Sequence, residues 1–324
     1  MSDTGRRRFL AAAGALSIAT TARAQTIRYP SKTIRIIVPF TPGAFTDQIA
    51  RVLAQKLNDV WKSPVVVENR PGAGTVLGAD LVAKAAPDGH TLLLVGFAFG
   101  VSPSLQAKLP YDPINDFAPV ALCAGTPNLL VVHPDLPVRN VAELIALAKS
   151  KPGALTFASA GPGSSTHLSM ELLKQKAGLD LVHVPYKGSA PAMLDVISGR
   201  VPITFDNVPN ILPQVKAGKL RAIAVTTPRP FALLPQLPTV AATVPGFEVG
   251  SWFGLSATGR TPRDVIDRLN QAVNRALLLP DVTSLFREQG VEVIGGSSEQ
   301  FGVHVRSQIA KWAPVVKAAG LAAT

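Results

Sequence analysis

The sequence has little cysteine, little charge and no long apolar run. Its one cysteine, Cys123, excludes a disulfide framework and a thiolate metal site, so we expect a small buried side chain there. No two histidines have the HxxxH spacing that places both imidazoles on one helix face, and we expect neither a metal site nor a cofactor. The five histidines are His90, His133, His167, His183 and His304.

Charged residues make up 16% of the chain and hydrophobic residues 47%, a balance that argues against disorder. The 26 glycines and 28 prolines indicate many turns. The formal net charge is +11, but the basic residues are scattered, with no run of five and no interleaved aromatics. We therefore expect no nucleic-acid partner, although a diffuse positive field helps to attract a small anion.

No apolar run reaches the roughly 20 residues that span a bilayer. At the N-terminus, three arginines precede an apolar stretch that ends in a plausible cleavage site before Gln25. We interpret residues 1–24 as a signal peptide of the twin-arginine type, with general secretion as the alternative because Gly5 and Ala11 depart from the common pattern. No cysteine follows the cleavage site to carry a lipid, so the mature protein is expected to be soluble in the periplasm.

Strand, loop and helix patterns alternate along the chain, which predicts an α/β fold with a mostly parallel sheet covered by helices on both faces. The expected strands are 34–38, 65–67, 92–95, 129–132, 155–158, 181–184, 203–205, 221–225 and 252–256. The expected helices are 47–57, one that runs through 81–82, 141–148, 168–176, 190–198, 264–278 and 298–318.

A chain of 324 residues exceeds one typical domain, so we expect two. The first lobe is predicted to be discontinuous, with residues 25–124 and 227–324, and the second, 125–226, to be inserted in it. The proline-rich passage 228–238 is interpreted as the return crossing between them.

Three strand-to-helix junctions, 39–47, 159–167 and 186–191, combine glycine with hydroxyl residues. The carboxyl ends of parallel strands face a crevice, where the N–H groups at a helix start bind anions. In this interpretation the glycines let backbone amides approach a ligand and the hydroxyls donate to it. The alternative, which the sequence leaves open, is that the hydroxyls cap helices and the glycines only turn the chain. The glycines are Gly43, Gly161, Gly163 and Gly188, and the hydroxyl residues are Thr46, Ser164, Ser165 and Thr166.

Four further side chains belong to these junctions or lie near them. Two alternative roles stay open for Lys187 and Asp206, and one role is expected for Tyr186 and for Asp47. Lys187 either supplies a counter-charge or is solvated, and Tyr186 forms an apolar wall. Asp206 either accepts from a ligand amine or organises the turn with Asn207. Asp47 is expected to stabilise the start of the first helix.

The chain resembles the Bug receptors, the extracytoplasmic solute-binding proteins of the tripartite tricarboxylate transporter family. The resemblance covers nearly all of the mature chain. It lies in IRIIVPFTPGAFTD (34–47), VVVENRPGAGTVLGAD (65–80), PDGHTLLL (87–94), YDPINDFAPV (111–120), SAGPGSSTHL (159–168), HVPYKGSAPA (183–192), GKLRAIAVT (218–226) and WFGLSATGRTP (252–262).

This resemblance implies a type II periplasmic-binding-protein fold, in which two α/β lobes joined by crossing strands close over a ligand. The implied ligand is a small carboxylate: a di- or tricarboxylate, an acidic amino acid or an aromatic acid. The implied partners are the permease subunits of a tripartite tricarboxylate-type transporter, and the receptor is expected to be a monomer. The implied ligand-binding residues are Phe40, Thr41, Gly43, Ala44, Phe45, Thr46, Asp47, Phe97, Ala98, Ser159, Gly161, Gly163, Ser164, Ser165, Thr166, His167, Tyr186, Lys187, Gly188, Ala190 and Asp206.

The chain departs from the family pattern in two places that bear on the ligand and the fold. Ala44-Phe45 replaces a second glycine and a small residue, so Phe45 is expected to narrow the pocket or to stack on a flat ligand such as an aromatic acid. Thr75 and His90 stand where glycine and tyrosine are usual.

Enzymatic readings find little support. Glycines at 72, 74 and 78 imitate a dinucleotide fingerprint, but the next strand ends in Leu94-Val95-Gly96 without the acidic residue that would bind a ribose. No GxSxG nucleophile elbow is present, and we predict no catalytic residue. A receptor that signals to a sensor kinase instead of feeding a permease remains an alternative, because both outputs need only a closed lobe pair.

Overall fold

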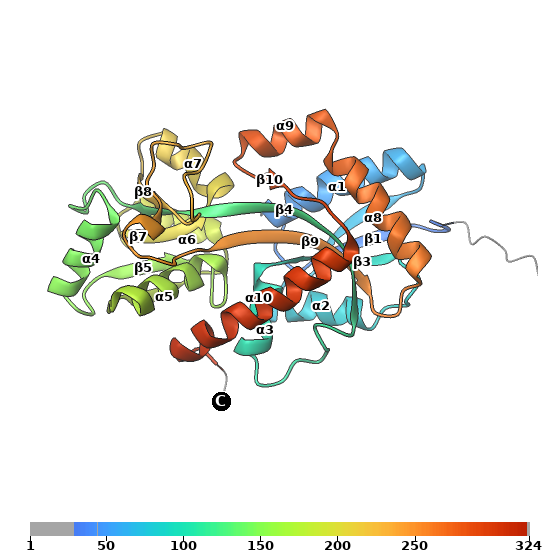
Figure 1. Ribbon diagram of the computed structural model, residues 1–324, viewed down its shortest axis with the longest axis horizontal. Coiled ribbons are helices and arrows are strands. Elements are labelled where there is room, and N and C mark those ends of the chain that lie inside the picture. The colour runs from blue at the N-terminus through green and yellow to red at the C-terminus, as the bar shows by residue number, and fades with distance from the viewer. Residues whose placement is uncertain (1–28, 44, 323–324) are drawn as a thin grey trace, which may run out of the picture.

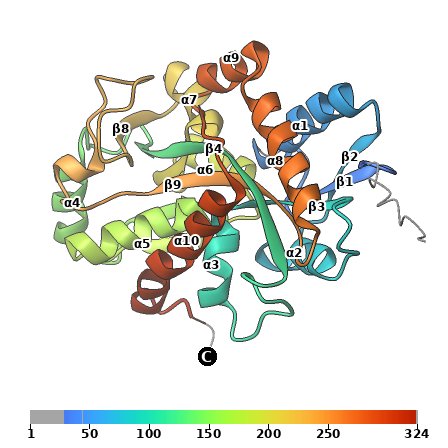
Figure 2. The same ribbon diagram turned by 45° about the vertical axis from the view of Figure 1, so that its right-hand side comes forward.

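The computed structural model describes residues 29–43 and 45–322. The predicted signal peptide and Ala44 lie outside these residues. The fold is mixed α/β, with one curled sheet and helices on both sides of it (Figures 1 and 2).

The strands are β1 (Ile34–Val38), β2 (Val65–Asn69), β3 (Thr91–Gly96), β4 (Phe117–Val132), β5 (Thr156–Ser159), β6 (Val182–Pro185), β7 (Ile203–Asn207), β8 (Arg221–Val225), β9 (Gly250–Thr258) and β10 (Glu292–Val293). The α-helices are α1 (Phe45–Trp61), α2 (Val76–Ala83), α3 (Phe97–Leu105), α4 (Val141–Ser150), α5 (Ser165–Ala177), α6 (Ser189–Ile197), α7 (Val208–Lys216), α8 (Arg263–Leu277), α9 (Pro280–Glu288) and α10 (Ser298–Ala318). Two short 3₁₀ turns are η1 (Ala73–Thr75) and η2 (Val240–Ala242).

The strand order is β2-β1-β3-β9-β4-β7-β5-β6, and β8 and β10 also pair with β4. Strands β1, β2 and β3 pair in parallel in the first half, as do β5, β6 and β7 in the second. All pairings that involve β4 or β9 are antiparallel. The expected mostly parallel sheet is therefore mixed, because the two strands shared between the halves run against their neighbours.

Strand β4 joins the two halves. Residues 117–127 pair with β9, and residues 128–132 pair with β7 and β8. Figure 1 shows β4 and β9 running side by side from one group of elements to the other. The sequence predicted only the last four residues of this strand, and the predicted lobe boundary at 124/125 lies inside it.

The expected return crossing at 228–238 is wrong. Phe231, Leu234 and Leu237 from this passage pack on the core of the second half. The following segment stays there as well, since Phe247 stacks on Phe205 of β7 with ring centroids 6.0 Å apart. The chain returns only at β9, so packing places the passage up to residue 249 with the second half. The division into two lobes remains a prediction, with this later second boundary.

Each half contains an apolar cluster, and a third cluster, which includes Leu93 of β3 and Phe205 of β7, extends across both. In the first, Ile36 and Leu92 of the sheet pack with Leu53 of α1 and Leu269 of α8, all completely buried. Cys123 belongs to this cluster and is completely buried, as expected. In the second, strand residues such as Val131 and Ala158 pack against α6 and α7. Among the described residues, no helix is long and apolar enough to cross a membrane.

Candidate functional site

A cavity of about 700 Å³ lies between the two halves, beside the start of β9. It is lined from the first half by Phe40, Thr41, Pro42, Gly43, Phe45, Thr46, Gly96, Phe97, Ala98, Ser251 and Phe253. It is lined from the second half by Ala160, Ser164, Ser165, Thr166, Lys187, Gly188, Ser189, Ala190, Pro191, Met193, Leu194, Ile197, Asn207, Asn210 and Gln214.

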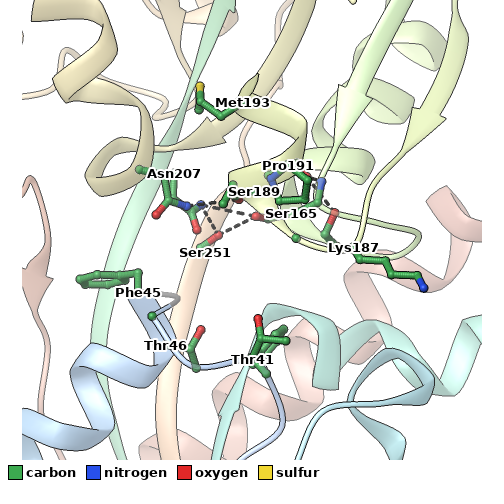
Figure 3. A pocket seen from close by; sticks show the side chains of 18 of the residues that line it. Thr41, Phe45, Thr46, Ser165, Lys187, Ser189, Pro191, Met193, Asn207 and Ser251 are labelled. Carbon is green, nitrogen blue, oxygen red and sulfur yellow. Dashed lines mark hydrogen bonds between the residues drawn. The ribbon is translucent and has the colours of Figure 1, made fainter. Parts of the chain in front are cut away.

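Four helices begin at residues that line this cavity: α1 and α3 from the first half, and α5 and α6 from the second. The first N–H groups of a helix lack an intrahelical acceptor, and the helix dipole adds partial positive charge there. Lys187 is the only charged residue in the described lining, its side chain is exposed, and Figure 3 shows it extending away from the other side chains. The cavity therefore offers a positive potential almost entirely through neutral groups, which suits an anion.

The first loop is held by Asp47 of α1. Its carboxylate accepts from the Gly43 N–H at 3.1 Å, from Arg51 at 2.9 Å and from Asn69 at 2.9 Å. Asn69 also donates to the Phe40 carbonyl. Burial opposes ionisation of Asp47, but these hydrogen bonds outweigh it and lower the pKa. Asp47 does not line the cavity; it shapes the loop that does.

The hydroxyls of the second loop mostly bond to the loop itself. Ser164 donates to the Gly161 carbonyl at 2.6 Å, so its oxygen can only accept from Thr166, 2.8 Å away. Thr166 in turn accepts from the Ala160 N–H at 2.8 Å. Ser164 is also the N-cap of α5, accepting from the His167 N–H. Their hydrogens are used inside the loop, which leaves Ser165 as the hydroxyl donor of this junction.

Two stacked imidazole rings support this loop behind the cavity lining. The rings of His167 and His183 lie 3.8 Å apart, and Phe157 stacks on both. The Gly163 N–H donates to Nδ1 of His167, which leaves the ring hydrogen on Nε2. Nε2 of His183 lies 2.6 Å from the hydroxyl of Ser159. Burial first, and then the charge of neighbouring groups, lowers the pKa of His167 to about 3 and that of His183 to about 4. The pair is neutral at ordinary pH and acts as packing.

Glycine is required at Gly163 for two reasons. Its φ of +74° is a left-handed conformation, and an added Cβ would lie 2.1 Å from Cδ1 of Leu105 in α3. Gly163 thus lets the second loop approach the first half closely.

The third loop is tied to the second and to α7. The Gly188 N–H donates to the Ala160 carbonyl at 3.1 Å, and the Tyr186 hydroxyl donates to Asp195 at 2.6 Å. Asp206 accepts from Ser189, Asn210 and the backbone N–H of Asn207. Burial raises the pKa of Asp206 to about 6, and these hydrogen bonds limit the rise. Asp206 positions three lining residues without lining the cavity itself, which favours the turn-organising alternative.

Phe45 closes one side of the cavity (Figure 3). It is nearly buried and packs edge-on against Phe253 and Phe286, with ring centroids 5.3 and 6.3 Å away. Met193, Leu194 and other apolar residues of α6 line another part. The cavity therefore has both apolar walls and hydrogen-bonding groups.

The structure brings most of the predicted site residues to this cavity. Those that line it are Phe40, Thr41, Gly43, Phe45, Thr46, Phe97, Ala98, Ser164, Ser165, Thr166, Lys187, Gly188 and Ala190. Seven predicted residues do not line it and support the loops or α7 from behind: Asp47, Ser159, Gly161, Gly163, His167, Tyr186 and Asp206. Ala44 lies outside the described residues. Ligand contact by the lining residues remains a prediction.

Apart from Ala190, the lining residues of α6 were not predicted from the sequence, and neither were those of α7 and β9. Asn210 and Gln214 were missed because α7 was not predicted, and Ser251 and Phe253 because the return crossing was placed too early. Asn207 had a signal, since it follows Asp206 at a predicted strand end.

Comparison with known proteins gives close relatives. The family model for the tripartite tricarboxylate transporter family receptor matches residues 49–321. The protein BugT of Bordetella pertussis is 38% identical, over 96% of this chain and 95% of its own. The structure of Rpa4515 from R. palustris with adipate is 40% identical, has a TM-score of 0.85 and covers 91% of this chain and 99% of its own. MatC from Rhodopseudomonas palustris with bound malate is 34% identical, has a TM-score of 0.82 and covers 89% of this chain and all of its own.

These matches confirm the resemblance and the fold class inferred from the sequence. The family-model match, residues 49–321, includes parts of both halves. The protein accordingly belongs to the tripartite tricarboxylate transporter receptor family, the periplasmic solute-binding receptors of the TctC and Bug type.

Proposed function

We propose that this receptor captures a small carboxylate between its two halves and delivers it to a tripartite tricarboxylate-type membrane transporter. The observation that carries the proposal is the convergence of four helix N-termini, those of α1, α3, α5 and α6, on a cavity without an acidic residue in its described lining. The relatives solved with adipate and with malate support a carboxylate as the ligand.

Capture is expected to proceed by closure of the halves. The donors of α1 and α3 belong to the first half and those of α5 and α6 to the second, so a bridging ligand gains its full set of contacts only in the closed form. Such a ligand shifts an existing open–closed equilibrium. Small-angle scattering should then show a smaller radius of gyration with ligand bound.

Ligand capture is tested by thermal unfolding and calorimetry of the purified protein against di- and tricarboxylates, acidic amino acids and aromatic acids. A ligand at 100 times its dissociation constant stabilises by about 2.7 kcal/mol. Ser165→Ala removes one donor to a charged ligand, worth about 1.5–3 kcal/mol, and should weaken binding at least tenfold. Ser150→Ala, on the exposed end of α4, is the matched control and should bind normally. Absence of binding by every carboxylate after refolding would reject the proposal.

We also propose that residues 1–24 direct export through the twin-arginine route and that the mature receptor works as a monomer in the periplasm. The arginine pair Arg7-Arg8 before an apolar stretch supports the route. Replacement of both by lysine should abolish export if the route is right, and leave it intact if general secretion is used. Uptake of the identified ligand by cells with and without the receptor gene tests delivery.

A further inference from the structure

The hydrogen bonds around Asn207 fix which end of its amide faces the cavity. Asn128 of β4 is hydrogen-bonded to Asn207 and is completely buried. Its Nδ2 lies 3.2 Å from the carbonyl oxygen of Ser165, an atom that only accepts, and 2.9 Å from the Ser169 hydroxyl. The Asn128 Oδ1 therefore faces Asn207 and accepts from its Nδ2.

The second hydrogen of the Asn207 amide is also used. It is donated to the Ser251 hydroxyl at 2.7 Å, and Ser251 donates onward to Ser165 at 2.7 Å. Figure 3 shows these side chains joined on one side of the cavity, with Thr41 and Thr46 opposite. Both hydrogens of the Asn207 amide are thus used in bonds to the protein. No described residue donates to Oδ1 of Asn207, so this oxygen is the atom of the amide that faces the cavity.

Asn210, one turn further along α7, has the same polarity for an independent reason. Its Nδ2 donates to the Asp206 carboxylate at 3.0 Å and to Ser189 at 3.3 Å. Ser189 itself donates to Asp206, so its oxygen is free to accept. Oδ1 of Asn210 receives no hydrogen bond from any described residue, and Asn210 lines the cavity.

The α7 side of the cavity is consequently a wall of hydrogen-bond acceptors. Asn207 and Asn210 are followed on the same helix face by Gln214, whose side chain is half-buried and also lines the cavity. A carboxylate oxygen or a hydrocarbon placed here would leave two amide oxygens without partners, at a cost in affinity. The helix starts of α1, α3 and α5 are the places that favour the carboxylate.

We propose that the ligand carries, besides its carboxylate, a hydrogen-bond-donating hydroxyl or amino group that binds the acceptor wall of Asn207 and Asn210. This inference rests on the proposed function, since it specifies the ligand of the same cavity. Sites built to pair with a ligand donor discriminate strongly against analogues that lack it.

Matched ligand series on one carbon skeleton test the inference. They are succinate, malate and aspartate; hexanoate, 6-hydroxyhexanoate and 6-aminohexanoate; and benzoate, 4-hydroxybenzoate and 4-aminobenzoate. In the series that binds, a donor-bearing member should bind at least tenfold more tightly than its parent, and the arms separate hydroxyl from amino. A parent that binds as tightly would overturn the inference and leave the receptor function standing. Absence of binding in all three series and in the wider carboxylate panel would overturn both.

Two variants locate the effect. Asn210→Leu removes an acceptor of the wall, and Gln214→Leu, separately, replaces the next polar group on the same helix face by an apolar one. Each should reduce the ratio of affinities between the donor-bearing ligand and its parent. Asn58→Leu, on the exposed face of α1, is the matched control and should keep the preference. An unchanged preference in both variants would refute the assignment. Gln214 is half-buried near the end of α7, so its variant is expected to fold even if Asn210→Leu does not.

Discussion

Thr75 adopts a backbone conformation that disfavours its side chain. Its φ of +88° and ψ of −10° are left-handed, and it is a β-branched residue just before α2. The side chain is 5% exposed, and its hydroxyl makes no hydrogen bond to any described residue. We expect Thr75→Gly to stabilise the protein.

The expected magnitude follows from four contributions. Release of the left-handed strain gains about 1–2 kcal/mol, and removal of a buried unpaired hydroxyl gains about 1–3 kcal/mol. The added freedom of glycine in the unfolded chain costs about 0.5–1 kcal/mol, and loss of the buried methyl group costs about 0.8 kcal/mol. The net stabilisation is about 0.2–3.7 kcal/mol, with a centre of about 2 kcal/mol that corresponds to about 3 °C in the midpoint of thermal unfolding.

Denaturant and thermal unfolding of Thr75→Gly, Thr75→Ala and the parent protein measure this difference. Thr75→Ala removes the hydroxyl but keeps Cβ, so the glycine variant should be the more stable of the two. Ala142→Gly, at an exposed position of α4, is the control and should lose about 1 kcal/mol, as glycine does in an ordinary helix. A glycine variant at position 75 that is no more stable than the parent would refute the strain argument.

Three further outcomes are expected. The folded-state pKa of Asp206, about 6, lies above its unfolded value, so the contribution of Asp206 to stability is lost as pH rises through 6. The free energy of unfolding of Asp206→Asn, relative to that of the parent protein, should therefore rise by on the order of 2 kcal/mol between pH 4 and 7.5. The same difference between variant and parent at both pH values would contradict this. The lowered pKa values of His167 and His183 predict stability that is present above pH 6.5 and lost as pH falls toward 4; imidazole NMR signals that titrate near 6.5 in the folded protein would show the cause to be wrong. Gly163→Ala should lower the free energy of unfolding by about 1–3 kcal/mol more than Gly178→Ala does, because both positions have positive φ but only Gly163 has a neighbour within 4 Å of an added Cβ. Equal losses of unfolding free energy in the two variants, measured with denaturant, would show that the close approach at Gly163 does not matter.

Local patterns were sufficient to place the regular elements. The β-branched run at 34–38 is β1, and the predicted helix at 298–318 is α10, whose N-cap Ser297 and Gln300 form a capping box. Three helices were missed: α3 and α7 contain an internal proline, Pro103 and Pro213, and α9 begins with Pro280. Prolines lower the helical signal of a segment, but tertiary packing of its apolar face restores the helix.

The site was predictable to the extent that its chemistry is local. Glycine and hydroxyl residues at a strand-to-helix junction indicate a ligand loop from composition alone, and all three such loops reach the cavity. The roles of individual hydroxyls were not predictable, since Ser164 and Thr166 satisfy each other. The acceptor wall was also out of reach, because the orientation of Asn207 is set by Asn128, 79 residues earlier in the chain.

The position of β9 in the sheet has a consequence for how the chain folds. β9 lies between β3 and β4, although it follows β4 by more than a hundred residues in the sequence. Until residue 258 is available, β3 has only β1 as a neighbour and residues 117–127 of β4 lack β9, so the first half cannot complete its sheet from the N-terminal part of the chain alone. Pairing over so long a separation is slow, because the loop must be closed before any contact is gained. The chain therefore spends its early folding time with two long strand edges exposed, and its last third decides when the rest becomes native.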